Sequence, residues 1–196
     1  MKIDNALIGQ LQQQIGNDCP KAFKDLYALF FPRLFNFAVL YVHKKEIAEE
    51  IVNDVMVKIW NKRQTITDIQ NLETYLFVAV RNHSCNYLSS YSSYHIAIEQ
   101  EGTQAKVINL NDPQKELEWK EISFQLDRTI SKLPDQCRTV FKLIREDGFR
   151  YKQVAEILNI SPRTVETQLS RAIKKLDKVI QAYHGKLNEK TGKINF

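Results

Sequence analysis

The clearest chemical pattern in the sequence lies between Tyr151 and Leu176, where two stretches with helical apolar spacing are separated by a short polar break. Asn159 stands in this break and tolerates the left-handed backbone that a tight turn between helices requires. Ser161 is a good helix cap and Pro162 a good first helical residue, so together they predict the start of the second helix. This order is typical of a helix-turn-helix, whose second helix enters the major groove of DNA.

The second of these helices divides into a buried seam and a basic polar surface. Val165, Leu169 and Leu176, with Ala172 or Ile173, have the spacing of one apolar stripe. Polar side chains near the N-terminal end of such a helix reach base edges, and basic side chains further along reach phosphates. An ordinary amphipathic helix with a solvated charged face is the alternative, but it leaves the turn and the Ser-Pro start unexplained.

Charge is distributed unevenly along the 196 residues, whose formal net charge is +5. Residues 1–114 contain 11 Lys and Arg against 12 Asp and Glu, which gives −1, whereas residues 115–196 contain 17 against 11, which gives +6. The basic excess therefore accompanies the helix-turn-helix, as binding to a polyanionic duplex requires.

The near-neutral first half contains a second pattern, an acidic cluster on a predicted helix over 44–63. The apolar seam of this helix repeats every four residues, and acid and amide groups gather on the early turns of the opposite side: Glu46, Glu49, Glu50, Asn53 and Asp54. Acidic residues near a helix N-terminus are favourable through the helix dipole. The same groups also suit a basic protein partner, and the residues alone leave both interpretations open.

Two tyrosines, Tyr91 and Tyr94, lie among serines in a predicted polar loop that follows a helix over 70–88. Aromatic side chains in such a segment suit stacking on unpaired bases. A loop that only confers solubility has the same composition, so this pattern does not decide between the two. Lys and Arg are absent from residues 82–105, and no strong grip on a duplex is expected there.

The sequence gives no indication of an enzyme. The four histidines lack the spacing of a metal-binding HExxH motif, and no Gly-rich phosphate loop is present. The three cysteines are widely spaced, which argues against disulfides and against a zinc site. We therefore expect no catalytic residue, metal, cofactor or small-molecule substrate. The absence of a signal peptide pattern or a membrane-spanning apolar run predicts a cytoplasmic protein.

The elements that position these residues are all expected to be helical. Apolar residues from Phe23 to Val42 crowd more than one side of a predicted helix, which Pro32 is expected to bend or divide. Neither a period-two strand pattern nor alternation of strands and helices appears. We predict an all-α fold of two helical domains joined by a flexible linker: domain 1–97, linker 98–115, a helix-turn-helix domain 116–184 and a flexible tail 185–196.

These residues resemble a known family, the bacterial RNA polymerase sigma factors of the extracytoplasmic-function type within the sigma-70 family. The resemblance covers residues 23–88 and 126–180. It implies that the chain binds core RNA polymerase and directs promoter-specific transcription initiation. The first domain, similar to sigma region 2, would recognise and melt the −10 element, and the second, similar to region 4, would bind the −35 element.

The resemblance also implies roles for individual residues. EIAEEIVNDVMVKIW is similar to the helix that docks on a basic coiled coil of the largest polymerase subunit. YLFVAVRNHSCNYL and the loop after it resemble the segment that reads the −10 element and captures a flipped base, although relatives usually have several Lys or Arg in that loop. The core-binding candidates are Glu49, Glu50, Asn53, Asp54 and Trp60, and the −10 candidates are Arg81, Asn82, Asn86, Tyr87, Tyr91 and Tyr94.

The C-terminal helix-turn-helix resembles the −35-binding module. Base readout is expected from Arg163, Thr164, Thr167 and Gln168, and phosphate contacts from Arg171, Lys174 and Lys175. The resemblance further implies an anti-sigma factor as a partner, and the subgroup most similar to this chain answers membrane-bound regulators.

Three other interpretations are open. A response-regulator-type transcription factor has a similar C-terminal helix-turn-helix, but its receiver domain needs strands that the first half lacks. A helical adaptor would use only the acidic cluster to bind another protein. A small helical hydrolase has no motif in its favour. Promoter-specific initiation with purified core polymerase distinguishes the sigma factor from all three.

Overall fold

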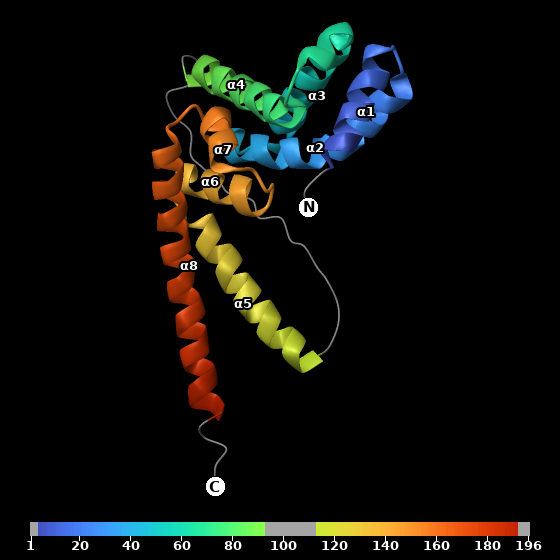
Figure 1. Ribbon diagram of the computed structural model, residues 1–196. Coiled ribbons are helices and arrows are strands. Elements are labelled where there is room, and N and C mark those ends of the chain that lie inside the picture. Colours follow the sequence, from blue (N-terminus) through green and yellow to red (C-terminus); the bar gives the residue numbers. More distant parts are fainter. Residues whose placement is uncertain (1–3, 93–112, 192–196) are drawn as a thin grey trace. The chain divides into compact units, whose positions relative to one another are not determined.

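The computed structural model describes residues 4–92 and 113–191, with side chains at 4–90 and 121–183. Every regular element in these ranges is helical, as predicted, and none is a strand (Figure 1). The elements are α1 (Asn5–Gly16), α2 (Pro20–Val42), α3 (Lys45–Asn61), η1 (Arg63–Asp68), α4 (Leu72–Ser92), α5 (Pro113–Ser131), α6 (Asp135–Arg145), α7 (Tyr151–Leu158) and α8 (Pro162–Thr191).

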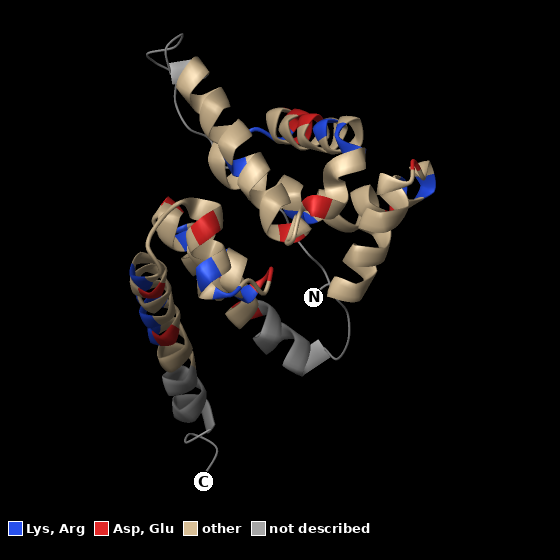
Figure 2. Ribbon diagram, turned by 45° about the horizontal axis from the view of Figure 1, so that its top comes forward, with Lys and Arg blue, Asp and Glu red and all other residues tan. Residues whose placement is uncertain are grey.

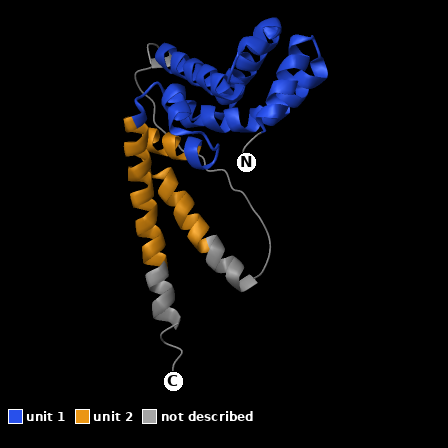
Figure 3. Ribbon diagram, viewed as in Figure 1, with its two compact units in different colours: residues 1–102, 143–162 blue, residues 103–142, 163–196 orange. Residues whose placement is uncertain are grey.

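The described residues divide into two compact units (Figure 3). Unit 1 contains α1 to α4 and also residues 143–162, which include α7. Unit 2 contains α5, α6 and α8. Residues 143–162, which we call the returning segment, were predicted to belong to the C-terminal domain. The predicted linker lies mostly outside the described residues, so the division at 98–115 stays a prediction.

The core of unit 1 is built around α2. Leu26, Phe30 and Leu34 are spaced by four residues and are fully buried, because α3 and α4 pack against this face. By length and composition α2 is also apolar enough to cross a membrane, a property that the sequence analysis did not foresee. The buried apolar stripe of α2 and the ion pair made by Arg33 near its middle are both typical of a core helix in a folded unit.

Pro32 lies on the exposed side of α2, and the helix passes through it undivided. The solvent side of a packed helix tolerates the lost hydrogen bond, because water can satisfy the freed carbonyl. Pro32 was expected to bend or divide the helix; it does not divide it, and the bend stays a prediction.

The connection between α3 and α4 was not predicted to be helical, yet it contains η1. Gln12 of α1 is buried and its Nε2 donates to the carbonyl oxygens of Ile66 and Ile69, at 2.8 and 3.0 Å. A buried amide donor without a partner would cost free energy, so these two bonds fix η1 against α1.

Turn residues behave as their chemistry predicts. Asn159 ends α7 in the left-handed conformation, with φ 52° and ψ 51°, and Pro162 is the first residue of α8. Gly148 has φ 76° in the turn after α6. The predicted left-handed turn residue and the predicted first residue of the second helix are thereby confirmed.

Unit 2 has a small core of its own. Leu133, Cys137 and Ala172 are buried together, with Phe141 packed against them. The thiol of Cys137 donates to the carbonyl oxygen of Gln168 at 3.1 Å, which joins α6 to α8. Helix α8 continues to Thr191, into residues expected to form the tail.

Candidate functional site

The acidic cluster forms an exposed face of α3. Glu46, Glu49, Glu50 and Asp54 are all exposed. Figure 2 colours the Asp and Glu positions of the ribbon red. The opposite side of the helix buries Ile51, Val55 and Ile59 in the core of unit 1. Since the apolar stripe fixes the rotation of the helix, the carboxylates are held toward solvent, where a partner can reach them.

Asn53 differs from its acidic neighbours because its side chain is held by a residue of another helix. The Tyr27 hydroxyl of α2 donates to Asn53 Oδ1 at 2.8 Å. Burial, and then the negative charge of Glu49, raise the pKa of Tyr27, so the hydroxyl stays protonated and available as a donor. With its oxygen engaged, Asn53 keeps two amide N–H donors for a partner. The sequence analysis did not identify Tyr27.

Trp60 lies near the C-terminal end of α3 and packs against α2. Its ring lies 5.0 Å from the ring of Phe23 on α2, and the Arg63 guanidinium lies 4.8 Å from its centroid. The Arg63 side chain is itself paired with Asp18. Trp60 therefore braces α3 against α2, and it is half-buried rather than a free contact residue.

A surface cavity of about 520 Å³ lies between α3, η1 and α4. Two predicted −10 residues, Asn82 and Asn86, line it together with Tyr75 and three basic side chains that were not foreseen: Lys58, Lys62 and His83. The cavity is large enough for a nucleobase and combines apolar walls with amide groups that can donate and accept hydrogen bonds. The cavity places Asn82 and Asn86 beside the positive charges of Lys58 and Lys62. Residues 82–105 contain no Lys or Arg of their own.

The basic groups of this cavity interact with each other. The Lys58 ammonium donates to His83 Nε2 at 2.8 Å, which requires a neutral imidazole. Burial, and then the charge of Lys58, lower the pKa of His83, while Asp54 opposes that change. The positive charge of the cavity near neutral pH therefore resides on the lysines.

The remaining −10 candidates are placed less uniformly. Arg81 is half-buried; its Nη1 donates to Asn82 Oδ1 at 3.2 Å, and it also hydrogen bonds Tyr41, whose pKa burial raises to about 12. Tyr87 is half-buried on α4 and lies outside the cavity lining. The predicted loop begins later than expected, because α4 continues to Ser92. The side chain of Tyr91 and the whole of Tyr94 lie outside the described residues.

The predicted DNA-reading helix presents its basic residues to solvent. Arg163, Thr167, Arg171, Lys174 and Lys175 are exposed on α8, whereas Val165, Leu169, Ala172 and Leu176 are buried. The seam predicted for α8 is thereby confirmed, with Ala172 rather than Ile173 as its fully buried member. Figure 2 shows the blue basic positions along this helix.

Two candidate base-reading residues of α8 are half-buried, namely Thr164 and Gln168. Gln168 Nε2 donates to Gln136 Oε1 of α6 at 3.1 Å, and Thr167 donates back to the carbonyl oxygen of Arg163 at 2.9 Å. A base contact by Gln168 would thus exchange an existing hydrogen bond rather than add one. Arg163 is the more available reader of a base edge.

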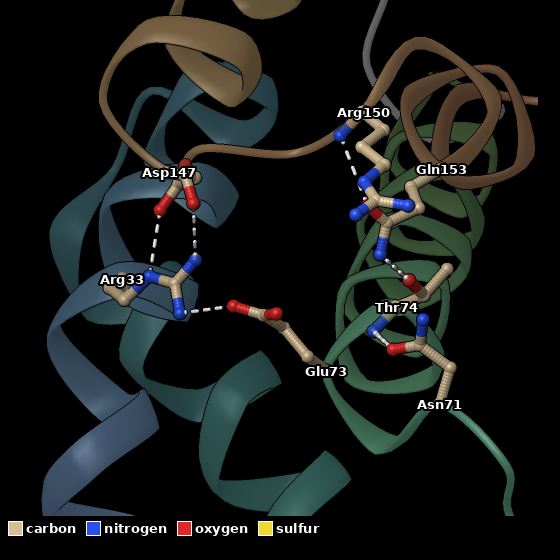
Figure 4. A network of polar contacts seen from close by, with 7 residues as sticks. All are labelled: Arg33, Asn71, Glu73, Thr74, Asp147, Arg150 and Gln153. Carbon is tan, nitrogen blue, oxygen red and sulfur yellow. Dashed lines mark hydrogen bonds and ion pairs between the residues drawn. The ribbon is translucent and has the colours of Figure 1, made fainter. Parts of the chain in front are cut away.

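A polar network within unit 1 was not foreseen (Figure 4). Arg33 of α2 bonds Glu73 of α4 and, through Nε at 2.8 Å, Asp147 of the returning segment. In the same unit Gln153 Nε2 of α7 donates to Thr74 Oγ1 of α4 at 3.2 Å. The only signal in the sequence was that Arg33 is the one charged residue between Leu26 and Val42, in a largely apolar stretch. Such an Arg requires partners, but the sequence does not say which.

Two family profiles match the chain: "Sigma-70 region 2" matches residues 26–93, and "Sigma-70, region 4" matches residues 123–176. Among curated proteins, the chain is 22% identical to the RNA polymerase sigma-H factor of Pseudomonas aeruginosa, over 88% of this chain and 93% of that protein. It is 23% identical to the ECF RNA polymerase sigma-E factor of Escherichia coli K12, over 87% and 93%.

Solved structures give the same result for the fold. The sigma factor RpoE of Bartonella quintana, solved in complex with the anti-sigma factor NepR, aligns with a TM-score of 0.60 at 25% identity, over 82% of this chain and 98% of that one. CnrH, solved in complex with the cytosolic domain of CnrY, aligns with a TM-score of 0.54 at 20% identity, over 89% and 97%.

Proposed function

Because this chain belongs to the sigma-70 family, as a sigma factor of the extracytoplasmic-function type, we propose that its acidic α3 face docks on core RNA polymerase while α4 and α8 read the promoter. The chain directs promoter-specific initiation as sigma factors do, and a response-regulator role is not favoured. What remains to be assigned is which residues carry each contact. The single observation that carries the assignment is that α3 of unit 1 has an exposed acidic face and α8 of unit 2 has an exposed basic one.

For core binding we assign Glu49, Glu50, Asn53 and Asp54 as contact residues, with Trp60 as the brace behind them. Three exposed carboxylates and the half-buried amide of Asn53 on one helix complement a basic partner surface, and such complementarity sets both orientation and association rate.

For the −10 element we assign the cavity between α3, η1 and α4 as the place where an unpaired base is bound. Asn82 and Asn86 offer both donors and acceptors to a base edge, and Lys58 and Lys62 supply charge for the phosphates. Arg81 and Tyr87 flank this cavity on α4, and Tyr91 and Tyr94 stay candidates for base stacking. For the −35 element the assignment is that of the sequence analysis, with base readout by the first turns of α8 and phosphate contact by Arg171, Lys174 and Lys175.

The partners follow from the same family membership: core RNA polymerase and promoter DNA. The similar RpoE structure contains an anti-sigma factor, which supports an anti-sigma factor for this chain as well. We assign it no catalytic activity of its own, since sigma factors act as initiation factors, and we place it in the cytoplasm with the transcription machinery. The proposal includes a membrane-bound anti-sigma factor as the regulator of this chain.

The experiment that tests this function is transcription in vitro with purified core polymerase and genomic DNA fragments. Added chain is expected to produce transcripts that begin at defined sites and that core polymerase alone does not produce. Transcripts whose start sites are unchanged by the chain would contradict the assignment. Binding to core without promoter-specific initiation would favour the adaptor interpretation instead.

Tyr27→Phe is expected to weaken core binding by about threefold to tenfold, because it frees Asn53 to rotate while leaving the aromatic ring in place. The measurement is the equilibrium dissociation constant of the labelled chain for core polymerase. Tyr41→Phe, which removes a hydroxyl from another position of α2, is the matched control. An equal loss in both variants would show that Tyr27 has only a structural role.

A further inference from the structure

Two consecutive residues of α6 hold the same residue of α8. Cys137 donates from Sγ to the carbonyl oxygen of Gln168 at 3.1 Å, and the side-chain nitrogen Nε2 of Gln168 donates to Gln136 Oε1, also at 3.1 Å. All three residues belong to unit 2. One bond fixes the backbone of Gln168 and the other fixes its side chain, so α6 determines both where Gln168 lies and how its amide is turned.

The bond to the backbone of Gln168 comes from the core of unit 2. Cys137 is only 1% exposed. Burial raises the pKa of the Cys137 thiol, although the positive charges of Lys175 and Arg171 oppose that change, so the thiol stays protonated near neutral pH and keeps its proton for Gln168. Because a buried donor without an acceptor costs free energy, the backbone of Gln168 is held in place.

The bond to the side chain of Gln168 lies at the surface of unit 2. Gln136 is exposed and Gln168 is half-buried. Gln168 follows the start of α8 at Pro162 by six positions, which is about 9 Å of helix. Thr164, a candidate for base readout, precedes it by one turn, and Arg171, a candidate for phosphate contact, follows it by three positions. Gln168 therefore lies between the two kinds of proposed DNA contact.

The bond between the two glutamines has a direction. Gln136 accepts through Oε1, so it holds the Gln168 amide by its nitrogen. It is the nitrogen of Gln168 whose contact with a base would exchange this bond, because the carbonyl oxygen Oε1 of Gln168 takes no part in it and keeps its lone pairs. Gln168 is therefore biased toward acting as an acceptor, and not as a donor, toward DNA.

An acceptor in the major groove distinguishes two classes of base. Adenine and cytosine present amino groups there, N6 and N4, which donate hydrogen bonds. Guanine and thymine present the keto oxygens O6 and O4, which accept them. An amide that presents its oxygen therefore favours an amino base, and an amide that presents its nitrogen favours a keto base. The direction in which one amide is held decides which class is preferred.

We propose that Gln136 is a positioning residue for promoter recognition: it fixes the direction of the Gln168 amide, and Gln168 then selects an amino base, adenine or cytosine, in the −35 element. Gln136 needs no contact of its own with a base to have this effect. The proposal rests on the proposed readout of the −35 element by the first turns of α8, and it adds the class of base that one residue of α8 reads.

The test measures binding of the holoenzyme to −35 duplexes that differ at one base pair each, taken from a promoter identified by transcription with the same chain. Fluorescence anisotropy gives each affinity. The informative base pair is the one at which Gln168→Ala changes the ratio of affinities most. At that pair the unsubstituted chain is expected to prefer an amino base over a keto base by about threefold to tenfold, as one neutral hydrogen bond provides.

Two substitutions of the exposed Gln136 separate its acceptor role from its charge. Gln136→Glu keeps an acceptor for the Gln168 nitrogen, so the preference for the amino base is expected to stay within about twofold of its original value. Gln136→Lys offers only donors, so Gln168 turns its oxygen toward the ammonium, and the preference is expected to fall by about tenfold or to reverse. The ratio of two duplexes is the quantity compared, because an added charge acts on the phosphates of both duplexes alike.

Gln125→Lys makes the same charge change at an exposed glutamine of α5 and is expected to leave the ratio unchanged. Gln136→Lys is also expected to have no effect on the ratio in a chain that carries Gln168→Ala, because its effect acts through the Gln168 amide. Equal ratios in Gln136→Glu and Gln136→Lys would overturn the proposal, as would a shift that persists without that amide.

The outcome for Gln168→Ala separates this proposal from the proposed function. If Gln168→Ala alters no ratio at any base pair, Gln168 reads no base and the role of Gln136 is overturned, while Arg163→Ala still tests readout of the −35 element by α8. If the unsubstituted holoenzyme binds all of the duplexes equally, the proposed −35 readout itself is contradicted.

Discussion

The double substitution Glu50→Lys and Asp54→Lys is expected to weaken binding to core polymerase by at least about a hundredfold. These residues are four apart on the exposed face of α3, so the change turns one continuous acidic surface basic. Against a basic partner surface, attraction becomes like-charge repulsion, which costs several kcal/mol at a close interface. The helix itself should remain folded, since both side chains lie away from the buried stripe.

Titration of labelled chain with core polymerase measures this effect, at two salt concentrations. The defect should be larger at low ionic strength, where charges are less screened. The control variant carries Asp68→Lys and Asp177→Lys, an equal charge change at exposed positions outside α3. If the double variant binds core as tightly as the unsubstituted chain, the acidic cluster does not contact core polymerase. Its role is then only the favourable interaction with the helix dipole.

Arg163→Ala is expected to reduce the affinity of the holoenzyme for its −35 duplex by about tenfold to a hundredfold, with little change for unrelated duplexes. Arg163 is exposed in the first turn of α8, where a helix in the major groove meets base edges. The duplex for this measurement is taken from a promoter identified by transcription with the same chain. Fluorescence anisotropy then gives the ratio of the two affinities.

Arg171→Ala is the matched variant for that experiment, because it removes the same guanidinium two turns further along α8. A phosphate contact carries no sequence information, so its loss should weaken both duplexes alike and lower the salt dependence by about one unit of slope. Core association should be unchanged in both variants. If Arg171→Ala instead lowers only the affinity for the −35 duplex, and Arg163→Ala weakens both duplexes alike, the assigned roles of the two residues are exchanged.

Local features of this protein could be predicted from sequence because each depends on a few neighbouring residues. The left-handed Asn159, the Pro162 start and the buried stripes of α2, α3 and α8 follow from backbone sterics and helical spacing. The end of α4 could not be predicted in this way, since Ser89 to Ser92 lack apolar spacing. There Ser89 Oγ donates to the Cys85 carbonyl oxygen at 2.9 Å, one turn earlier in the same helix.

Long-range pairing explains the rest of what the sequence did not show. Arg33 could pair with any acid that the fold brings near, and only the structure selects Glu73 and Asp147. Likewise, Tyr27 contacts Asn53 only because α2 packs against α3. Lys58 contacts His83 only because α3 packs against α4. The roles of Tyr91 and Tyr94 stay predictions.

Arg33 and Asp147 are 114 positions apart in the sequence, and this separation determines when their ion pair can first form during synthesis. A ribosome adding 5–20 residues each second needs about 6–23 s to cover that distance. Throughout this interval the nascent chain has α2 but lacks the segment that will cover it. The Arg33–Asp147 ion pair of each molecule therefore forms only after most of the chain has been made.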